Sequence, residues 1–254
     1  MSFAALRASL QKGPVITAWC GIPEPWIAGI LAREGFDAVT LDMQHGSYDT
    51  AAVIRAIPLI LGAGKPAMAR IPVGEFQTAS KLLDAGASAI IAPMINTAED
   101  ARRFASFMKF PPIGERSWGP VPSMILSGLQ PAEYLREANG CCLSFAMIET
   151  REALASLDEI LAVPGIDAIF LGPSDLSITL TQGAVLNLTS AEVEKALDHA
   201  LSRAKTAGKI AGAYAPTGER AAEFVRRGFD FVALGSDTAF LRTAAQAALK
   251  AARA

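Results

Sequence analysis

The sequence predicts an α/β protein folded as a closed (β/α)8 barrel, and three observations support this prediction. Short apolar segments of strand length alternate along the 254 residues with segments of helical periodicity. The apolar segments contain few polar residues, as expected for parallel strands that are covered on both faces. A glycine followed by a buried-type segment recurs at residues 35–37, 86–88, 165–167 and 228–230. A helix-ending glycine before a strand is typical of repeated βα units.

The elements can be assigned in order from these signals. Residues 15–20 form an apolar, β-branched strand after a short amphipathic helix, and Pro25 suits the first turn of a helix that stops at Gly35. The remaining strands are expected at residues 36–41, 67–71, 89–94, 143–149, 167–171, 209–214 and 229–234. Helices are expected between and after them, including residues 50–61, 76–84, 98–107 and about 238–251. Eight strands and eight helices over residues 1–254 predict a single barrel domain.

One segment interrupts this alternation. Residues 110–130 contain the run PPIGERSWGP at 111–120, which is rich enough in proline and glycine to predict a long loop without a regular element. Long ordered loops often bind ligands or act as lids, although this one follows a helix rather than a strand.

Composition narrows the class of function. The formal charge of −2 provides no basic surface for a nucleic acid, so small-molecule chemistry is favoured. Three cysteines without metal-ligand spacing indicate neither a disulfide framework nor a zinc site. No leader and no apolar run of membrane length is evident. We therefore expect a cytoplasmic protein without a membrane partner.

Charged residues gather where the predicted strands end. Asp42 and His45 follow the second strand, Arg70 ends the third, Glu149 ends the fifth, and Asp175 comes shortly after the sixth. Barrel active sites are built at the carboxyl ends of the strands, so these residues predict an active site. A lone acid in such a position is often only a helix cap. Four strands that bring such residues to one rim favour a functional site for the set.

The acids and the arginine have distinct expected roles. Glu149 and Asp175, without a nearby His or Cys ligand, suit a hard divalent cation such as Mg²⁺ or Mn²⁺. They could instead cap the helices that begin near Thr150 and Leu176. Arg70 should point into the barrel mouth, where it could bind a carboxylate or enolate oxygen. An ion pair of Arg70 with Glu149 or Asp42 is the alternative.

The histidine is the expected general base. The chain has two histidines, and His199 lies within a helical pattern, which leaves His45 as the proton carrier beyond a strand. Asp42 could orient the His45 imidazole and raise its basicity, and a purely structural Asp–His hydrogen bond is the alternative. Asp84 is unusual because an acid in the last turn of a helix opposes the helix dipole. It is expected to be solvated or to have a partner elsewhere.

The positions of the lysines and glycines along the chain disfavour Schiff-base catalysis, phosphate binding and nucleotide binding. A Schiff-base enzyme needs a lysine at the carboxyl end of a strand, but Lys65 and Lys209 stand where strands begin. A phosphate site near Gly235 and Ser236 would face the negative charge of Asp237. No GxGxxG or GxxxxGK[ST] motif suggests a nucleotide.

Several motifs together resemble one known family. They are GFD at 35–37, Asp42 with His45-Gly46, ARIP at 69–72, LLDAGA at 82–87, PPIGER at 111–116, IETREA at 148–153 and GPSDLS at 172–177. In this order and spacing they resemble the HpcH/HpaI aldolases, which are metal-dependent pyruvate aldolases of the phosphoenolpyruvate/pyruvate barrel superfamily. The resemblance covers nearly the whole chain.

The resemblance implies an aldehyde-lyase that reversibly cleaves 4-hydroxy-2-oxo acids to an aldehyde and pyruvate, or a related 2-oxo acid such as hydroxypyruvate. It implies that Glu149 and Asp175 hold Mg²⁺ or Mn²⁺, with Co²⁺ as a further candidate and no organic cofactor. His45 with Asp42 would form the base system, and Arg70 would bind the 2-oxo acid and stabilise its enolate. The residues implied at the substrate carboxylate are Gly172 and the backbone N–H groups of Ser174 and Asp175.

The resemblance also implies a wider site and an assembly. Trp19, Tyr214 and Leu234 would shape the aldehyde pocket, and Asp84, Gln44 and Arg116 would support the site. Many family members have Glu where this chain has Gln44, so its aldehyde preference or pH profile is expected to differ. A homohexamer is implied, built from dimers that exchange their last helix.

Related reactions on the same site remain open alternatives. They are a 2-dehydro-3-deoxyglucarate-type aldolase, an oxaloacetate decarboxylase and a citramalyl-type lyase. A barrel that only binds 2-oxo acids is a weaker alternative, because it would leave the Asp42–His45 pair without a task.

Overall fold

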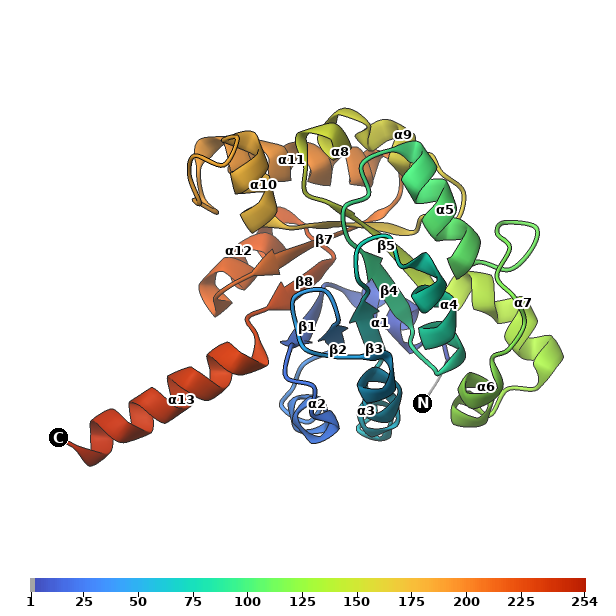
Figure 1. Cartoon of the computed structure of the whole chain (residues 1–254), viewed down its shortest axis with the longest axis horizontal. Helices are drawn as coiled ribbons and strands as arrows, with labels where there is room; N and C mark the ends of the chain where they lie inside the picture. Colours follow the sequence, from blue (N-terminus) through green and yellow to red (C-terminus); the bar gives the residue numbers. More distant parts are fainter. Residues whose placement is uncertain (1–2) are drawn as a thin grey trace.

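The predicted barrel is present in the computed structural model, which describes residues 3–254 (Figure 1). Its strands are β1 (Val15–Cys20), β2 (Ala38–Asp42), β3 (Ala67–Arg70), β4 (Ala89–Ala92), β5 (Leu143–Ile148), β6 (Ala168–Leu171), β7 (Ile210–Ala215) and β8 (Phe231–Leu234). Each strand pairs in parallel with the next, and β8 pairs with β1 to close the barrel. The first two residues of the predicted domain lie outside the described part of the chain.

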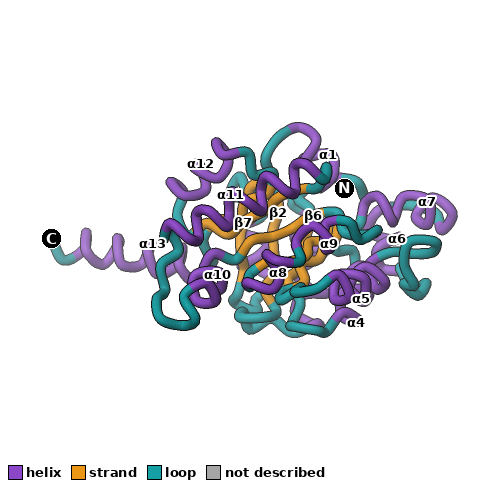
Figure 2. The backbone as a smooth tube through the Cα atoms, turned by 90° about the horizontal axis from the view of Figure 1, so that it is seen from above, coloured by secondary structure: helices purple, strands orange, loops and turns teal. Residues whose placement is uncertain are grey.

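Helices surround this barrel (Figure 2). They are α1 (Ala5–Lys12), α2 (Pro25–Leu31), α3 (Thr50–Gly62), α4 (Phe76–Asp84), α5 (Ala98–Met108), α6 (Val121–Ser127), α7 (Pro131–Cys141), α8 (Arg151–Ala155), α9 (Leu157–Leu161), α10 (Pro173–Leu180), α11 (Ala191–Thr206), α12 (Gly218–Arg227) and α13 (Asp237–Ala252). Residues 3–254 thus contain 13 helices rather than the expected eight, because several βα connections hold more than one. None of these helices combines the length and apolarity needed to cross a bilayer.

Helix α6 corrects the prediction that residues 110–130 contain no regular element. Pro122 stands in its first turn, where the missing N–H of proline breaks no helical hydrogen bond. Gly128 ends the helix with a left-handed φ of 75°. The prolines and glycines that suggested a loop therefore mark, in part, the two ends of a short helix.

Apolar side chains form two layers, one inside the barrel and one between the barrel and its helices. Strand side chains alternate between these layers. In β8, Phe231 and Ala233 belong to the inner cluster. Val232 belongs to the outer cluster, and Leu234 packs against it. The polar residues at the strand ends lie above the inner layer, which closes the floor of the barrel mouth.

The C-terminal helix α13 departs from this compact arrangement. It leaves the barrel after β8 and projects away from it in both views (Figures 1 and 2). Asp237 is its only buried residue.

Candidate active site

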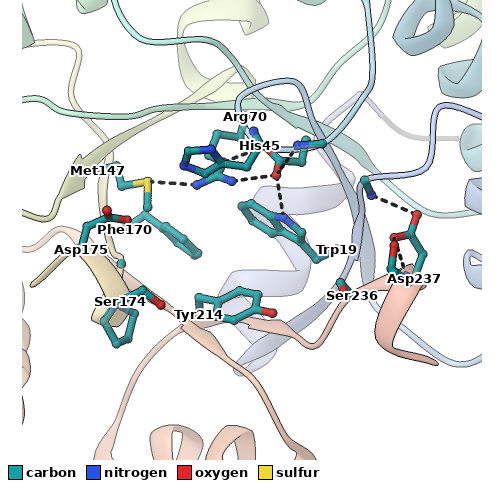
Figure 3. Close-up of a pocket in the computed structure, with 16 residues that line it drawn as sticks. Trp19, His45, Arg70, Met147, Phe170, Ser174, Asp175, Tyr214, Ser236 and Asp237 are labelled. Atoms are coloured by element: carbon teal, nitrogen blue, oxygen red, sulfur yellow. Dashed lines mark hydrogen bonds and ion pairs between the residues drawn. The ribbon is translucent and has the colours of Figure 1, made fainter. Parts of the chain in front are cut away.

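A cavity of about 310 Å³ opens at the carboxyl ends of the strands and collects most of the predicted site residues (Figure 3). Its lining includes the predicted Trp19, Asp42, His45, Arg70, Gly172, Ser174, Asp175 and Tyr214. It also includes Gly21, Gly46, Met147, Phe170, Pro173, Ser236, Asp237 and Thr238, for which no role was predicted.

Asp42 and Arg70 form a buried, bidentate ion pair in this cavity. Arg70 Nε donates to Asp42 Oδ1 at 2.8 Å, and Arg70 Nη2 donates to Oδ2 at 2.7 Å. Burial opposes ionisation of Asp42, but the hydrogen bonds and the charge of Arg70 outweigh it and hold the pKa of this carboxyl below its usual value. Of the two partners considered for Arg70, the structure selects Asp42 rather than Glu149.

Trp19 braces this ion pair from one side. Its indole N–H donates to Asp42 Oδ2 at 3.2 Å, and the Arg70 guanidinium carbon lies 4.9 Å from the centroid of the Trp19 ring. The indole also stacks on Phe170 and meets Tyr214 edge-on, with ring centroids 5.7 and 5.9 Å away. Aromatic contacts of this kind hold rings in fixed orientations, so the pair rests against a rigid wall.

The contact between Asp42 and His45 differs from the predicted one. Asp42 accepts hydrogen bonds from the backbone N–H groups of Gln44, His45 and Gly46, at 3.1, 3.5 and 3.1 Å. Within residues 3–254, no hydrogen bond joins the Asp42 carboxylate to the His45 ring. The reason is that Arg70, Trp19 and the loop backbone already occupy the carboxylate oxygens. Asp42 therefore shapes the loop that carries His45 instead of orienting the imidazole directly.

Glu149 lies just beyond β5, beside the lining residue Gly172, and does not itself line the cavity. Its Oε1 accepts the backbone N–H of Met94 at 2.9 Å, while Oε2 is buried and has no hydrogen-bond partner among the described residues. Met94 adopts a left-handed φ of 55°, which is uncommon for a residue other than glycine and marks a local constraint. Burial, with the charge of Asp175 as a further cause, raises the pKa of Glu149 to about 7.

Gly172 keeps space open beside this carboxylate. A Cβ at this position would lie 2.8 Å from Glu149 Oε2 and 2.7 Å from Met147 Cε. Gly172 is also the N-cap of α10, and Pro173, Ser174 and Asp175 form the first turn. The first N–H groups of a helix have no acceptor within the helix, so this turn points positive potential at the cavity.

Glu149 and Asp175 are suited to hold a divalent cation. A buried carboxylate oxygen without a partner is costly, and a cation would satisfy it. Within residues 3–254, no three His, Cys, Asp or Glu side chains cluster closely enough to enclose a metal ion. Two carboxylates instead suit a hard cation that keeps water and accepts oxygen atoms from a substrate.

Besides Glu149, four predicted residues lie away from the cavity lining. Leu234 faces the outer apolar layer, because the alternation along β8 directs Ala233 inward. Asp84 is neither fully solvated nor near this chain's cavity, since it pairs with Arg116 Nη2 at 2.7 Å. Arg116 is buried and lies over the Phe110 ring at 4.6 Å, which fastens the segment after α5. Gln44 does not line the cavity, and its Oε1 is buried without a partner among the described residues.

Some site residues were missed in the sequence, although part of the signal was present. Met147 and Phe170 occupy inward positions of β5 and β6 that looked like ordinary core. Asp237 was recognised only as an anion unfavourable to phosphate. Its position after the last strand matches the rim position of the other acids, so it could have been found by the same argument.

Comparisons with known proteins find relatives along nearly the whole chain. The model of the HpcH/HpaI aldolase/citrate lyase family matches residues 16–244. The chain is 40% identical over 251 residues to a hydroxypyruvate/pyruvate aldolase of Rhizorhabdus wittichii, covering 98% of each chain. It is 32% identical over 244 residues to a 4-hydroxy-2-oxo-heptane-1,7-dioate aldolase of Klebsiella pneumoniae, covering 96% of this chain and 91% of that one.

A solved structure extends the likeness to three dimensions. An HpcH/HpaI aldolase/citrate lyase family protein from Burkholderia cenocepacia superposes with a TM-score of 0.89 at 27% identity, covering 99% of this chain and 100% of that one. A family match over nearly the whole chain and a full-length relative at 40% identity show, as the motifs predicted, that this chain belongs to the HpcH/HpaI aldolase/citrate lyase family.

Proposed function

We propose that this chain is a divalent-metal-dependent aldolase that reversibly joins pyruvate or hydroxypyruvate to an aldehyde. The observation that carries the proposal is the convergence on one cavity of a cation (Arg70), a histidine (His45), a helix N-terminus and the Asp175 carboxylate. The Glu149 carboxylate lies beside Gly172 of the same cavity. The names of the relatives, hydroxypyruvate/pyruvate aldolase and 4-hydroxy-2-oxo-heptane-1,7-dioate aldolase, support the same reaction class.

The proposed binding of the 2-oxo acid uses the first turn of α10. The backbone N–H groups of Ser174 and Asp175, which follow the N-cap Gly172, donate hydrogen bonds to the substrate carboxylate. Arg70 lies close to the developing enolate oxygen and stabilises its charge. Asp42 and Trp19 serve this step by holding the guanidinium in place through the contacts described above.

His45 is the proposed general base. Its imidazole takes a proton from C3 of the 2-oxo acid as the enolate forms. C3 then adds to the aldehyde carbon, and the imidazolium returns the proton to the resulting alkoxide oxygen. Cleavage follows the same path in reverse. Trp19 and Tyr214, which line the cavity, are the proposed walls of the aldehyde pocket.

Glu149 and Asp175 are the proposed metal ligands, and Mg²⁺ or Mn²⁺ is the proposed ion. A bound divalent cation would supply Lewis-acid polarisation of the 2-oxo acid, which acidifies C3. The raised pKa of Glu149 and its unpartnered Oε2 support this assignment, since a cation would satisfy both.

An assembly through α13 is also proposed. Leu241 and Leu249 are exposed on this helix, and Leu241 with Phe240 borders an apolar groove lined by Ile22, Ile27, Ile30 and Leu31. Exposed apolar surface of this kind favours burial against a second copy. Two copies that exchange α13, as dimers within a hexamer, would bury this apolar surface. Light scattering should show a smaller assembly for Leu241→Glu, and an unchanged mass would refute the exchange.

The reaction can be tested with purified protein supplemented with Mg²⁺ or Mn²⁺. Pyruvate and hydroxypyruvate are offered with a panel of aldehydes that includes succinic semialdehyde and tartronate semialdehyde. Solvent exchange of the pyruvate methyl protons reports the proton-transfer step alone. The His45→Ala variant should lose about 10²-fold or more in both assays. His199→Ala, which changes an exposed histidine of α11, is the matched control. Near-normal rates in His45→Ala would refute the assignment.

A further inference from the structure

We infer that Asp237 is a positioning residue that holds the His45 loop through the segment after β1. This inference rests on the proposed function only for the role of His45 as the base. Asp237 is the first residue of α13, is 3% exposed and lines the cavity. It follows shortly after Leu234, the last residue of β8, and β8 is the strand that closes the barrel against β1.

The Asp237 carboxylate binds two backbone segments at once. Its Oδ2 accepts the backbone N–H groups of Gly21 and Ile22, at 2.9 and 2.8 Å. Its Oδ1 accepts the backbone N–H of Thr238 at 2.7 Å. Hydrogen bonds to a charged acceptor are stronger than those to a neutral one, so the anchor of the β1 segment is strong.

The anchored segment in turn touches the loop that carries His45. Gly21 accepts the backbone N–H of Ser47 at 2.8 Å. Gly46 packs so closely that a Cβ there would lie 2.8 Å from the Gly21 Cα and 2.3 Å from the Asp42 carbonyl oxygen. His45 is thus followed by two residues that contact Gly21 directly.

The His45 ring depends on this backbone support. Within the described residues, no group forms a hydrogen bond with the imidazole, so the path of the loop sets the ring position. Asp42 holds the near side of the loop by accepting three backbone N–H groups. Asp237 holds the far side by fixing Gly21.

A helix-capping role alone does not account for Asp237. Ser236 already caps α13, because its side chain accepts the backbone N–H of Ala239 at 3.2 Å. The two hydrogen bonds to Gly21 and Ile22 add nothing to the start of α13. They connect this helix to the active-site rim instead.

The expected kinetic signature follows from the position of Asp237 in the barrel. It acts at the junction of β8 and β1, whereas Glu149 and the α10 turn follow β5 and β6 on the opposite side. Loss of the anchor should therefore lower kcat and leave KM for the 2-oxo acid within about threefold. A displacement of about 1 Å can cost 10²-fold, so we expect a 10- to 100-fold fall in kcat.

Asp237→Asn and Asp237→Ala test this inference. The isosteric Asn preserves packing but can accept at one oxygen only, so it must lose either the Oδ1 or the Oδ2 contacts. Asp237→Ala removes all of them. Thr217→Ala is the matched control, because it removes an N-cap on the same rim, that of α12, without any contact to the β1 segment. Thermal denaturation verifies that each variant is folded.

Two measurements are made on each variant, and they separate this inference from the proposed function. One is the kcat and KM of the metal-supplemented aldol reaction. The other is the NMR signal of the ¹³C-labelled histidine rings, which is independent of activity. The two histidines are assigned with His45→Ala, and the exposed His199 is the internal reference. We expect the His45 signal to shift or broaden in Asp237→Ala while His199 stays unchanged.

The outcomes are decisive in both directions. A moved His45 signal with a lower kcat and a steady KM supports the inference. An unmoved His45 signal in Asp237→Ala overturns it, whatever the kinetics, and so does a moved signal with wild-type turnover. An inactive wild-type protein would refute the proposed function, while the NMR comparison would still report whether Asp237 positions His45.

Discussion

Replacing Glu149 by Gln should stabilise the metal-free protein at high pH and abolish its response to a divalent cation. Burial, together with the charge of Asp175, raises the pKa of this carboxyl from 4.5 to about 7. The metal-free protein must therefore hold an unfavourable buried charge above pH 7. Gln removes this charge and keeps an oxygen that can accept the Met94 N–H.

The size of the effect follows from proton linkage. Between pH 4.5 and 7 the folded state holds the proton and the unfolded state does not, so stability falls as pH rises. The full difference of 2.5 pKa units corresponds to about 3.4 kcal/mol, at 1.36 kcal/mol per unit. About 2.5 kcal/mol of this loss falls between pH 5 and pH 8. The burial cost of the new amide does not vary with pH and cancels in this comparison.

Urea denaturation of EDTA-treated protein at pH 5 and pH 8 measures this difference. The unfolding free energy of Glu149→Gln minus that of wild type should be about 2.5 kcal/mol larger at pH 8 than at pH 5. Glu152→Gln, the same change at an exposed position three residues later, should show no such pH dependence. An equal difference at both pH values would refute the reasoning about the buried charge.

Adding metal to the same proteins completes this test. Mn²⁺ or Mg²⁺ should raise the Tm of wild type and Glu152→Gln, because a ligand that binds only the folded state stabilises it. The Tm of Glu149→Gln should stay constant. A Tm increase equal to that of wild type would show that Glu149 is not a ligand of the metal.

Three further substitutions probe other contacts. Gly172→Ala should weaken the metal-induced Tm increase, because the new Cβ would lie 2.8 Å from Glu149 Oε2; an undiminished increase would contradict the proposed geometry. Trp19→Phe keeps a ring beside Arg70 but removes the N–H donor to Asp42, so kcat/KM should fall about tenfold, given the roughly 1.5 kcal/mol of a hydrogen bond to a charged group. Lys109→Met should lower the unfolding free energy by about 3–5 kcal/mol in urea denaturation, because Asp167 loses its buried partner at 2.6 Å. Its kcat/KM should remain that of wild type.

The barrel could be predicted from the sequence because each βα unit repeats the same local signals. Apolar segments between a helix-ending glycine and a polar rim residue are visible one unit at a time. The short helix α6 was missed because the joint richness of residues 110–130 in proline and glycine predicted a loop. Pro122 lies in the first turn, where proline is compatible with a helix, and local composition alone does not distinguish these positions.

The members of the site were predictable, but their pairing was not. Asp42 could be assigned either to His45 or to Arg70, since all of them end or follow strands. In the barrel, Asp42 and Arg70 are direct partners in the β2–β3 register. That register depends on how the whole barrel closes, which no local pattern reports. The same dependence explains Leu234: side chains alternate locally along β8, but closure of the barrel decides that Ala233 and not Leu234 faces inward.

The Asp42–Arg70 pairing limits what Arg70 can do for a substrate. Nε and Nη2, the edge that could grip a carboxylate with two hydrogen bonds, are already bound to Asp42. The remaining nitrogen, Nη1, lies 4.0 Å from Met147 Sδ, a weak acceptor. In the proposed reaction, Arg70 is therefore suited to a single oxygen that gains charge, while the carboxylate must be held by the first turn of α10. Because its ion pair fixes the guanidinium beforehand, Arg70 need not reorganise when the enolate forms.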